Sequence, residues 1–151
     1  SKYLKQSFSY CFQTNSNEYP ATLRLNSLDD NLSTIDKDKE IQIEYVEVEH
    51  GKVKSNCFII NKQLAYISDV SKIYEKDYKF FKNLEYFIID CLWYKFHPSH
   101  FNLEMCLKMI KQFSPKKSIL TNLHTDLDYE ILKRQLPNNI TPAYDGLTLE
   151  L

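Results

Sequence analysis

The residues of this chain that could do chemistry lie where short strand-like segments end. Five of them stand out, and they are His50, Asp69, His97, His100 and His124. Side chains just past a strand end are held by backbone hydrogen bonds and still face solvent, which suits ligands that must be both fixed and accessible. Neutral imidazole and ionised carboxylate groups donate lone pairs to zinc, manganese or iron. This placement favours a metal site, although the irregular spacing matches no short metal-binding motif.

Each of these residues also has a structural explanation that the sequence leaves open. His50 could be a strand-end histidine before a glycine turn, and Asp69 could cap a turn or a helix. His100 could lie against the start of a helix. For His97 the structural explanation is preferred, because the following proline fixes the loop. Asp90 ends a buried apolar run, where an ionised carboxylate needs hydrogen-bond partners, and it is predicted to support a metal ligand from behind.

Five strands are predicted to position these residues. Segment 41–50 alternates apolar and charged residues, as a half-buried strand does. Four short apolar runs bounded by polar residues have strand length, and they are 57–61, 63–68, 86–90 and 117–121. Asn61 and Lys62 are predicted to form a tight hairpin between two of them. Residues 1–40 show no clear periodicity, and 26–40 is predicted as a solvated turn or loop region.

Two helices are predicted between and after the later strands. The first begins after a cap at Asn102 and ends before Pro115. Its apolar face has the 3-4-7 spacing of a helix and comprises Leu103, Cys106, Leu107 and Ile110. The second is predicted over about 126–135, with Thr125 as its cap. Two acidic residues in its first turn would interact favourably with the helix dipole, and they are Asp126 and Asp128.

Composition indicates one folded domain in a reducing compartment. The 151 residues are 43% hydrophobic and 14% aromatic, and a domain of this size buries roughly 70% of the surface of its unfolded chain. The four cysteines form no CxxC pair, and Cys57, Cys91 and Cys106 lie in apolar segments, where free cysteine behaves as a small hydrophobe. We therefore expect a single domain over residues 1–151 and a cytoplasmic location.

Charge and hydropathy argue against two classes of partner. The 19 basic and 20 acidic residues are spread along the chain and give a net charge of −1, so no basic stripe is present for nucleic acid or an anionic membrane. The longest apolar run, 86–94, is interrupted by Asp90 and is far shorter than the roughly 20 residues that span a bilayer. The first residues also lack the apolar core of a signal peptide. We expect neither a nucleic acid nor a membrane as a partner.

Five motifs occur in the same order along this chain as in one family of hydrolases. They are HG at 50–51, YISDVS at 66–71, IIDCLWYKFHPSHFNLE at 88–104, ILTNLHTDLDYE at 119–130 and PAYDGLTLEL at 142–151. In this combination the chain resembles the metallo-β-lactamase superfamily, and specifically bacterial hydrolases similar to phosphoribosyl 1,2-cyclic phosphate phosphodiesterase. The resemblance extends over the whole chain.

The resemblance implies an α/β fold, the C-terminal half of a metallo-β-lactamase αβ/βα sandwich, with a mixed sheet and flanking helices. It also implies two divalent metal ions, zinc or manganese, at one edge of the sheets. His50 would bind one ion, Asp69 would bridge both, and His124 would bind the other. His100 would be a catalytic residue beside the scissile phosphate. The phosphodiesterase-like relatives usually carry histidine where this chain has Asn122, which leaves the register of the last ligand open.

The superfamily motif H-x-H-x-D-H, which supplies the remaining ligands, is absent from this sequence. The domain is therefore expected to be partial, its metal site incomplete, and the isolated chain inactive. The implied function is a metal-dependent phosphodiesterase that acts on a small, cyclic phosphodiester once an N-terminal half-domain completes it; a homodimer is the other expected assembly. The alternatives are an inactive or partner-binding half-domain, and another hydrolase of the superfamily that acts on thioesters or RNA ends.

Overall fold

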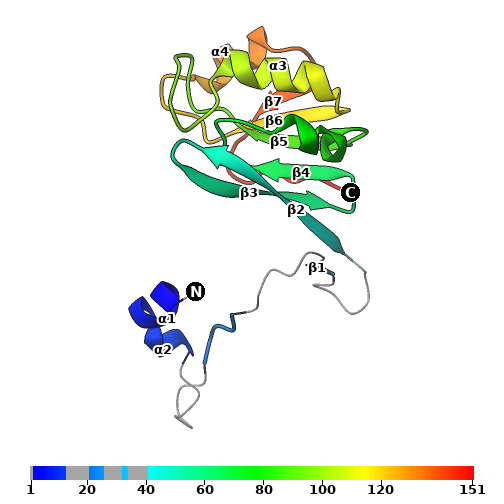
Figure 1. The fold of residues 1–151 in the computed structure, drawn as a ribbon. Helices are drawn as coiled ribbons and strands as arrows, with labels where there is room; N and C mark the ends of the chain where they lie inside the picture. The colour runs from blue at the N-terminus through cyan, green and yellow to red at the C-terminus, as the bar shows by residue number, and fades with distance from the viewer. Residues whose placement is uncertain (1, 13–20, 26–31, 34–40) are drawn as a thin grey trace.

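The computed structural model describes residues 2–12, 21–25, 32–33 and 41–151. Its main element is a mixed sheet, in which seven strands of the described part follow one another in chain order (Figure 1). The strands are β1 Leu32–Ser33, β2 Gln42–His50, β3 Val53–Ile60, β4 Leu64–Ile67, β5 Tyr86–Asp90, β6 Lys117–Thr121 and β7 Ile140–Pro142. The helices are α1 Lys2–Ser7, α2 Ser9–Phe12, the 3-10 helix η1 Glu75–Phe81, α3 Leu103–Phe113 and α4 Tyr129–Gln135.

Strands β1 to β4 pair antiparallel, and tight turns join the last three of them. Gly51, in the turn between β2 and β3, has a φ of +62°. In the turn between β3 and β4, Asn61 and Lys62 have φ values of 51° and 55°, the left-handed region that asparagine tolerates well. This turn confirms the predicted hairpin. The strand predicted over 57–61 begins earlier, at Val53, because its first residues are mostly polar and gave no apolar run.

Strands β4 to β7 pair parallel, so each connection crosses over the sheet. Helix η1 connects β4 to β5, α3 connects β5 to β6, and α4 connects β6 to β7. Successive right-handed crossovers that advance in one direction put their helices on one face of a sheet, and α3 and α4 do lie over the same face (Figure 1). Strands β5 and β6 have the predicted bounds.

Helix α3 begins as predicted. The side chain of Asn102 accepts a hydrogen bond from the backbone N–H of Met105 at 2.9 Å, which satisfies one of the free donors of the first turn. The helix ends at Ser114, which adopts the left-handed conformation with a φ of 51°, just before Pro115.

Helix α4 begins later than predicted, and Thr125 is not its cap. Asp128 is the cap, because its carboxylate accepts a hydrogen bond from the N–H of Ile131 at 2.9 Å. Asp126 does not lie in the first turn either. Its carboxylate accepts a hydrogen bond from the indole N–H of Trp93 at 2.8 Å, so a contact with a residue distant in sequence holds it outside the helix.

One face of the sheet forms the core with the helices. Its buried strand residues are Val46, Val48, Cys57, Ile59, Ala65, Ile67, Phe87, Ile89 and Leu120, and the helices add Cys106, Ile110, Phe113 and Leu132. The opposite face carries a row of paired apolar residues across five strands: Tyr45, Phe58, Tyr66, Ile88 and Ile119. Ile119 is buried, and the others are partly buried or exposed. The side of the sheet away from α3 and α4 is therefore apolar and only partly covered.

Most of the segment 26–40, predicted as a loop, lies outside the described residues; β1 is the described part of it. Among the helices of the described ranges, none combines the length and the apolar composition that crossing a membrane requires.

Candidate metal centre

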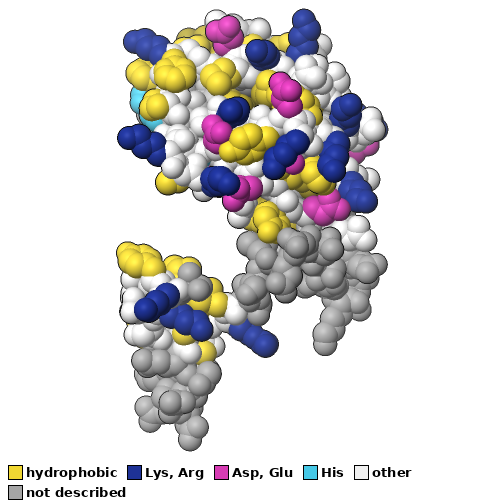
Figure 2. Space-filling view, in the orientation of Figure 1, with side chains coloured by type: hydrophobic (Ala, Val, Ile, Leu, Met, Phe, Trp, Pro, Cys, Tyr) yellow, Lys and Arg dark blue, Asp and Glu magenta, His cyan; other side chains and the backbone are white. Residues whose placement is uncertain are grey.

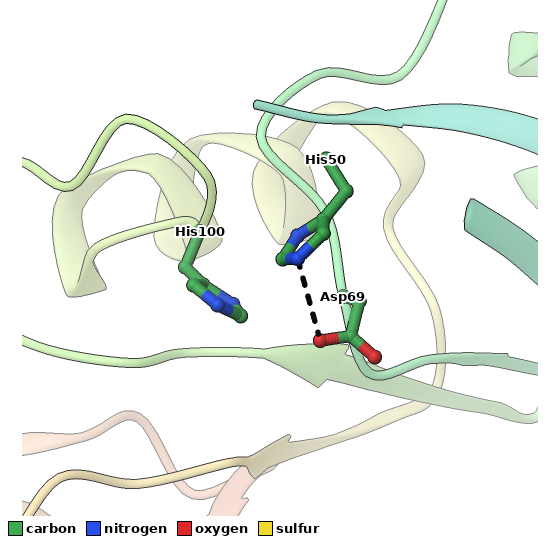
Figure 3. Close-up of side chains that lie close together, drawn as sticks. All are labelled: His50, Asp69 and His100. Carbon is green, nitrogen blue, oxygen red and sulfur yellow. Dashed lines mark ion pairs between the residues drawn. The ribbon is translucent and has the colours of Figure 1, made fainter. Parts of the chain in front are cut away.

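Three side chains from different elements meet at one edge of the sheet (Figure 3). His50 ends β2, Asp69 follows β4, and His100 lies in the loop between β5 and α3. Two successive antiparallel pairings make β2 run in the same direction as β4 and β5, so the ends of these strands share an edge. One potential ligand atom of each side chain lies within 4.8 Å of the other two.

The orientation of His50 is set by the loop before α3. Its Nδ1 lies 2.8 Å from the backbone carbonyl of Ser99. A carbonyl only accepts hydrogen bonds, so Nδ1 carries a proton, and in the neutral imidazole Nε2 then keeps its lone pair. That Nε2 lies 4.0 Å from Oδ1 of Asp69.

Gly51 allows this contact between His50 and Ser99. A Cβ built at Gly51 would lie 3.2 Å from the Cβ of Ser99 and closer still to its hydroxyl. The positive φ of Gly51 adds a second reason for glycine, because L side chains strain the left-handed region. The pair His50-Gly51 thus combines a possible ligand with the close backbone approach that orients it.

Serines from β3 and from the segment 68–71 hold Asp69 and its neighbours. The Ser68 hydroxyl donates to Oδ2 of Asp69 at 3.1 Å, and the Ser55 hydroxyl donates to the Asp69 carbonyl at 2.7 Å. The Ser71 hydroxyl accepts a hydrogen bond from the N–H of Gly51 at 3.0 Å. The side chain of Asp69 is 49% exposed, so its carboxylate is both oriented and accessible to a ligand.

His100 is held by Asp90, whose side chain is fully buried. Oδ2 of Asp90 accepts hydrogen bonds from Nδ1–H of His100 at 2.7 Å and from the N–H of Val70 at 3.1 Å. Its Oδ1 accepts one from the Asn122 amide at 3.0 Å. Burial raises the pKa of the Asp90 carboxyl, and the hydrogen bonds from Asn122, Val70 and His100 oppose that rise. Three donors to one carboxylate satisfy its ionised form, and the bond to Asp90 occupies Nδ1 of His100, so Nε2 is the ring nitrogen that can bind a ligand.

His124 lies apart from this group. Its ring lies 5.2 Å from the ring of Trp93, centroid to centroid. Its Nδ1 accepts a hydrogen bond from the N–H of Asp126 at 3.2 Å, and its side chain is 44% exposed. After β6 it is Asn122, with a φ of +60°, that borders the cluster through Asp90. The assignment of His124 as a metal ligand stays a prediction.

His97 lies in the loop before α3, and its Nδ1 accepts a hydrogen bond from the N–H of Ser99 at 3.2 Å. Its ring centroid is 5.2 Å from that of His100, yet it is not part of the cluster of ligand atoms. The predicted catalytic role of His100 is likewise untested by this geometry.

Sequence reasoning did not assign the roles of Ser99, Ser71 and Asn122. Ser99 acts through its backbone carbonyl, which no side-chain type reveals. Ser71 is part of the motif YISDVS at 66–71, but its bond to the Gly51 N–H depends on the packing of two loops. Asn122 stands where the phosphodiesterase-like relatives usually carry histidine. A polar residue directly after a buried strand is the signal that could have pointed to its contact with Asp90.

The donor set suits one divalent ion. Two imidazoles and a carboxylate are ordinary ligands of zinc and of related metals, and three protein ligands leave a position open for water or substrate. Within the described residues, His50, Asp69 and His100 are the group of three or more histidine, cysteine or acidic side chains that is close enough to hold an ion. A second ion of the expected pair would need further ligands.

Comparisons with known proteins bear on the fold. No protein-family model matches the chain, and no curated protein is significantly similar to it. Among solved structures, a diphosphatase from the PhnP family matches with a TM-score of 0.84 and 24% identity, over 99% of this chain and 55% of that one. The metallo-β-lactamase fold protein YhfI from Bacillus subtilis matches with a TM-score of 0.67 and 13% identity, over 95% and 61%. The short form of human tRNase Z matches with a TM-score of 0.58 and 15% identity, over 83% and 49%.

These matches confirm the fold expected from the sequence motifs. The mixed sheet with helices on one face superposes on roughly half of each matched chain, and this chain spans 55% of the length of the diphosphatase. The protein therefore has the metallo-β-lactamase fold, over a part that corresponds to about half of the chains it matches.

Proposed function

We propose that this chain is part of a metal-dependent hydrolase that acts on a small phosphodiester. The observation that carries the proposal is the convergence of His50, Asp69 and His100 within 4.8 Å at one edge of a metallo-β-lactamase fold. The sequence motifs around these residues resemble those of cyclic phosphate phosphodiesterases. The structural match to a diphosphatase supports the hydrolysis of a phosphate compound.

A divalent ion at this site would supply a Lewis acid and lower the pKa of bound water towards neutrality. In the roles taken from the resemblance, His50 and His124 would each hold one of two ions, and Asp69 would hold both. The exposed carboxylate of Asp69 and the free Nε2 of His50 suit this purpose. His100 would face the phosphate and supply a proton or a positive charge, and general-acid catalysis contributes roughly 10²–10⁴-fold.

We further propose that a second polypeptide segment bearing H-x-H-x-D-H covers the face of the sheet away from α3 and α4. The partly exposed side chains of Tyr45, Phe58, Tyr66 and Ile88 form an apolar row there. The matched structures are longer than this chain, which spans 55% of the diphosphatase. Such a segment would add ligands for a second ion and bury the row. A second copy of this chain could bury the same face but would bring no such motif.

A small substrate is favoured over a long nucleic acid. Lys, Arg, Asp and Glu side chains are intermixed on the face that Figure 2 displays, and the net charge is −1. Tracking a phosphate backbone requires an array of positive charge. The match to a tRNase Z shows that chains of this fold can differ in substrate, so hydrolysis of RNA ends or of thioesters is the alternative that substrate profiling must test.

The test is reconstitution. The chain would be co-expressed with the N-terminal part of the PhnP-family diphosphatase that it does not match, loaded with Zn²⁺ or Mn²⁺, and assayed on bis(p-nitrophenyl) phosphate and on a cyclic phosphodiester. We expect hydrolysis by the complex and none by the chain alone. Asp69→Ala should abolish both activity and metal binding, whereas the loop variant His97→Ala should retain both. A stable, metal-loaded complex that hydrolyses neither substrate would refute the proposal.

A further inference from the structure

We infer that His100 is the third ligand of a single divalent cation that His50 and Asp69 also bind, with Nε2 of each imidazole as the ligand atom. This inference rests on the proposed function only for the class of ligand, a divalent metal ion. It changes the role of His100 from a group that acts on the substrate to a group that holds the metal. It also predicts that this chain binds one ion without any other segment.

The first argument comes from the hydrogen bonds that Nδ1 of each imidazole makes with the protein. Nδ1 of His50 donates to the carbonyl of Ser99 at 2.8 Å, and Nδ1 of His100 donates to Asp90 at 2.7 Å. In the neutral form, both rings therefore offer the lone pair of Nε2 to a ligand. A metal-binding histidine almost always has this arrangement, with its other ring nitrogen bonded to a carboxylate or a backbone carbonyl.

The second argument is that the three side chains lie close enough together to bind one ion. The rings of His50 and His100 lie 4.6 Å apart between centroids and at 75° to each other, so they approach one point from different directions. The carboxylate of Asp69 borders the same space (Figure 3). Donors about 2.0 Å from a tetrahedral ion lie about 3.3 Å apart. The 4.0 Å between His50 and Asp69 therefore needs to close by about 0.7 Å, and a separation at the 4.8 Å limit by about 1.5 Å. The exposed side chain of Asp69 can shorten its own distances to the two imidazoles by rotation.

The third argument is that the contacts of His124 hold its side chain apart from the cluster. Its Nδ1 is occupied by the N–H of Asp126, and its ring lies on the indole of Trp93, so it would have to leave both partners to join the cluster. His100 needs no such rearrangement. One ion bound by His50, Asp69 and His100 thus uses side chains that already lie next to one another.

The test exploits the four histidines as matched positions. Asparagine can place an amide N–H near the position of Nδ1 and has no equivalent of Nε2, so His50→Asn and His100→Asn keep the donors to Ser99 and Asp90 while removing the ligand atoms. His97→Asn is the control, and His124→Asn tests the assignment taken from the motifs. Each purified variant would be titrated with Zn²⁺ by calorimetry and with Co²⁺ by visible absorption, with circular dichroism as a check of folding.

We expect the unmodified chain to bind about one Zn²⁺ ion. His50→Asn and His100→Asn should weaken binding by at least about 100-fold, more than the loss of a supporting residue costs, while His97→Asn and His124→Asn should bind as the unmodified chain does. Asp90→Asn, which removes the charge behind His100, should weaken Co²⁺ binding by about 10–100-fold and shift its absorption band. Unchanged Co²⁺ affinity in this variant would remove Asp90 from the proposal.

Three outcomes would overturn the inference. They are the absence of saturable Zn²⁺ binding by the chain, unchanged binding by folded His100→Asn, and a loss in His124→Asn as large as that in His50→Asn. Failure of the proposed function gives a different pattern. If the chain binds one ion through His100 and the reconstituted complex hydrolyses no phosphodiester, the inference stands and the proposed function fails. If the complex is active and His100→Asn keeps its metal, the proposed function stands and the inference fails.

Discussion

Replacing Gly51 by alanine tests whether the turn after β2 holds the site together. Gly51 has a φ of +62°, and an alanine in the left-handed region costs about 1–2 kcal/mol. The new Cβ would lie 3.2 Å from the Cβ of Ser99 and would meet its hydroxyl at a shorter distance, so Ser99 must move. Overpacking of this kind costs about 1–3 kcal/mol. We therefore expect Gly51→Ala to lose about 2–5 kcal/mol of unfolding free energy.

The measurement is urea unfolding followed by circular dichroism, with Gly146→Ala as the matched control. Gly146 also has a positive φ, +90°, but nothing lies within 4 Å of a Cβ built there. It should lose the backbone cost alone, about 1–2 kcal/mol. In the Gly51→Ala background, Ser99→Gly removes both atoms that the Cβ approaches most closely, so it should restore part of the lost stability. A loss in Gly51→Ala no larger than that in Gly146→Ala, or no coupling with Ser99→Gly, would refute the reasoning.

Three further predictions concern stability, each measured by urea unfolding. Asp128→Ala should lose about 1 kcal/mol as a helix cap is removed, whereas Thr125→Ala should change stability by less than about 0.5 kcal/mol; the opposite order would restore the cap predicted from sequence. Burial raises the pKa of the Cys57 thiol above its ordinary 9.0, so the unfolded chain releases this proton first and stability falls above that pH. The fall should be about 1.4 kcal/mol smaller in Cys57→Ala between pH 8 and pH 10, and equal falls would contradict it. Asn122→Gly keeps the positive φ and removes a donor to the buried Asp90, so it should lose about 1.5–3 kcal/mol, and a neutral result would mean that another group replaces the amide.

The parts of the fold that were predictable are those set by neighbours in sequence. Helix α3 has an apolar face of helical period and a cap at Asn102, and both act within a few residues. The start of α4 was not predictable in this way, because Thr125 and Asp128 are both good caps. The choice between them involves the bond from Trp93 to Asp126, which joins residues far apart along the chain.

The candidate site was likewise predictable in part. His50 and Asp69 were expected at one site because both lie at the ends of strand-like segments and the family resemblance implies that both bind metal, and the structure brings them to 4.0 Å. Whether His100 or His124 joins them depends on the conformations of the loop between β5 and α3 and the loop between β6 and α4. Hydrophobic periodicity does not predict the conformation of a loop. Asp90 was predicted to support a metal ligand because a carboxylate inside an apolar strand needs partners, and it is bonded to His100. The partner itself could not be read from the sequence.

The hydrogen bonds of the site form a closed circuit, which explains how three loops and the end of one strand can hold one geometry. The turn after β2 is bonded to the loop after β4, that loop to the end of β5, the end of β5 to the loop before α3, and this last loop back to β2. The four bonds are Gly51 N–H to Ser71 Oγ, Val70 N–H to Asp90, His100 to Asp90 and His50 to the carbonyl of Ser99. Two of the four run through the candidate ligands themselves. A change at one link therefore shifts its neighbours on both sides, and a ligand atom lost at one histidine need not disturb the circuit when the hydrogen bond behind it is kept. These protein hydrogen bonds therefore orient the ligand residues from behind, as a binding site requires of the residues around it.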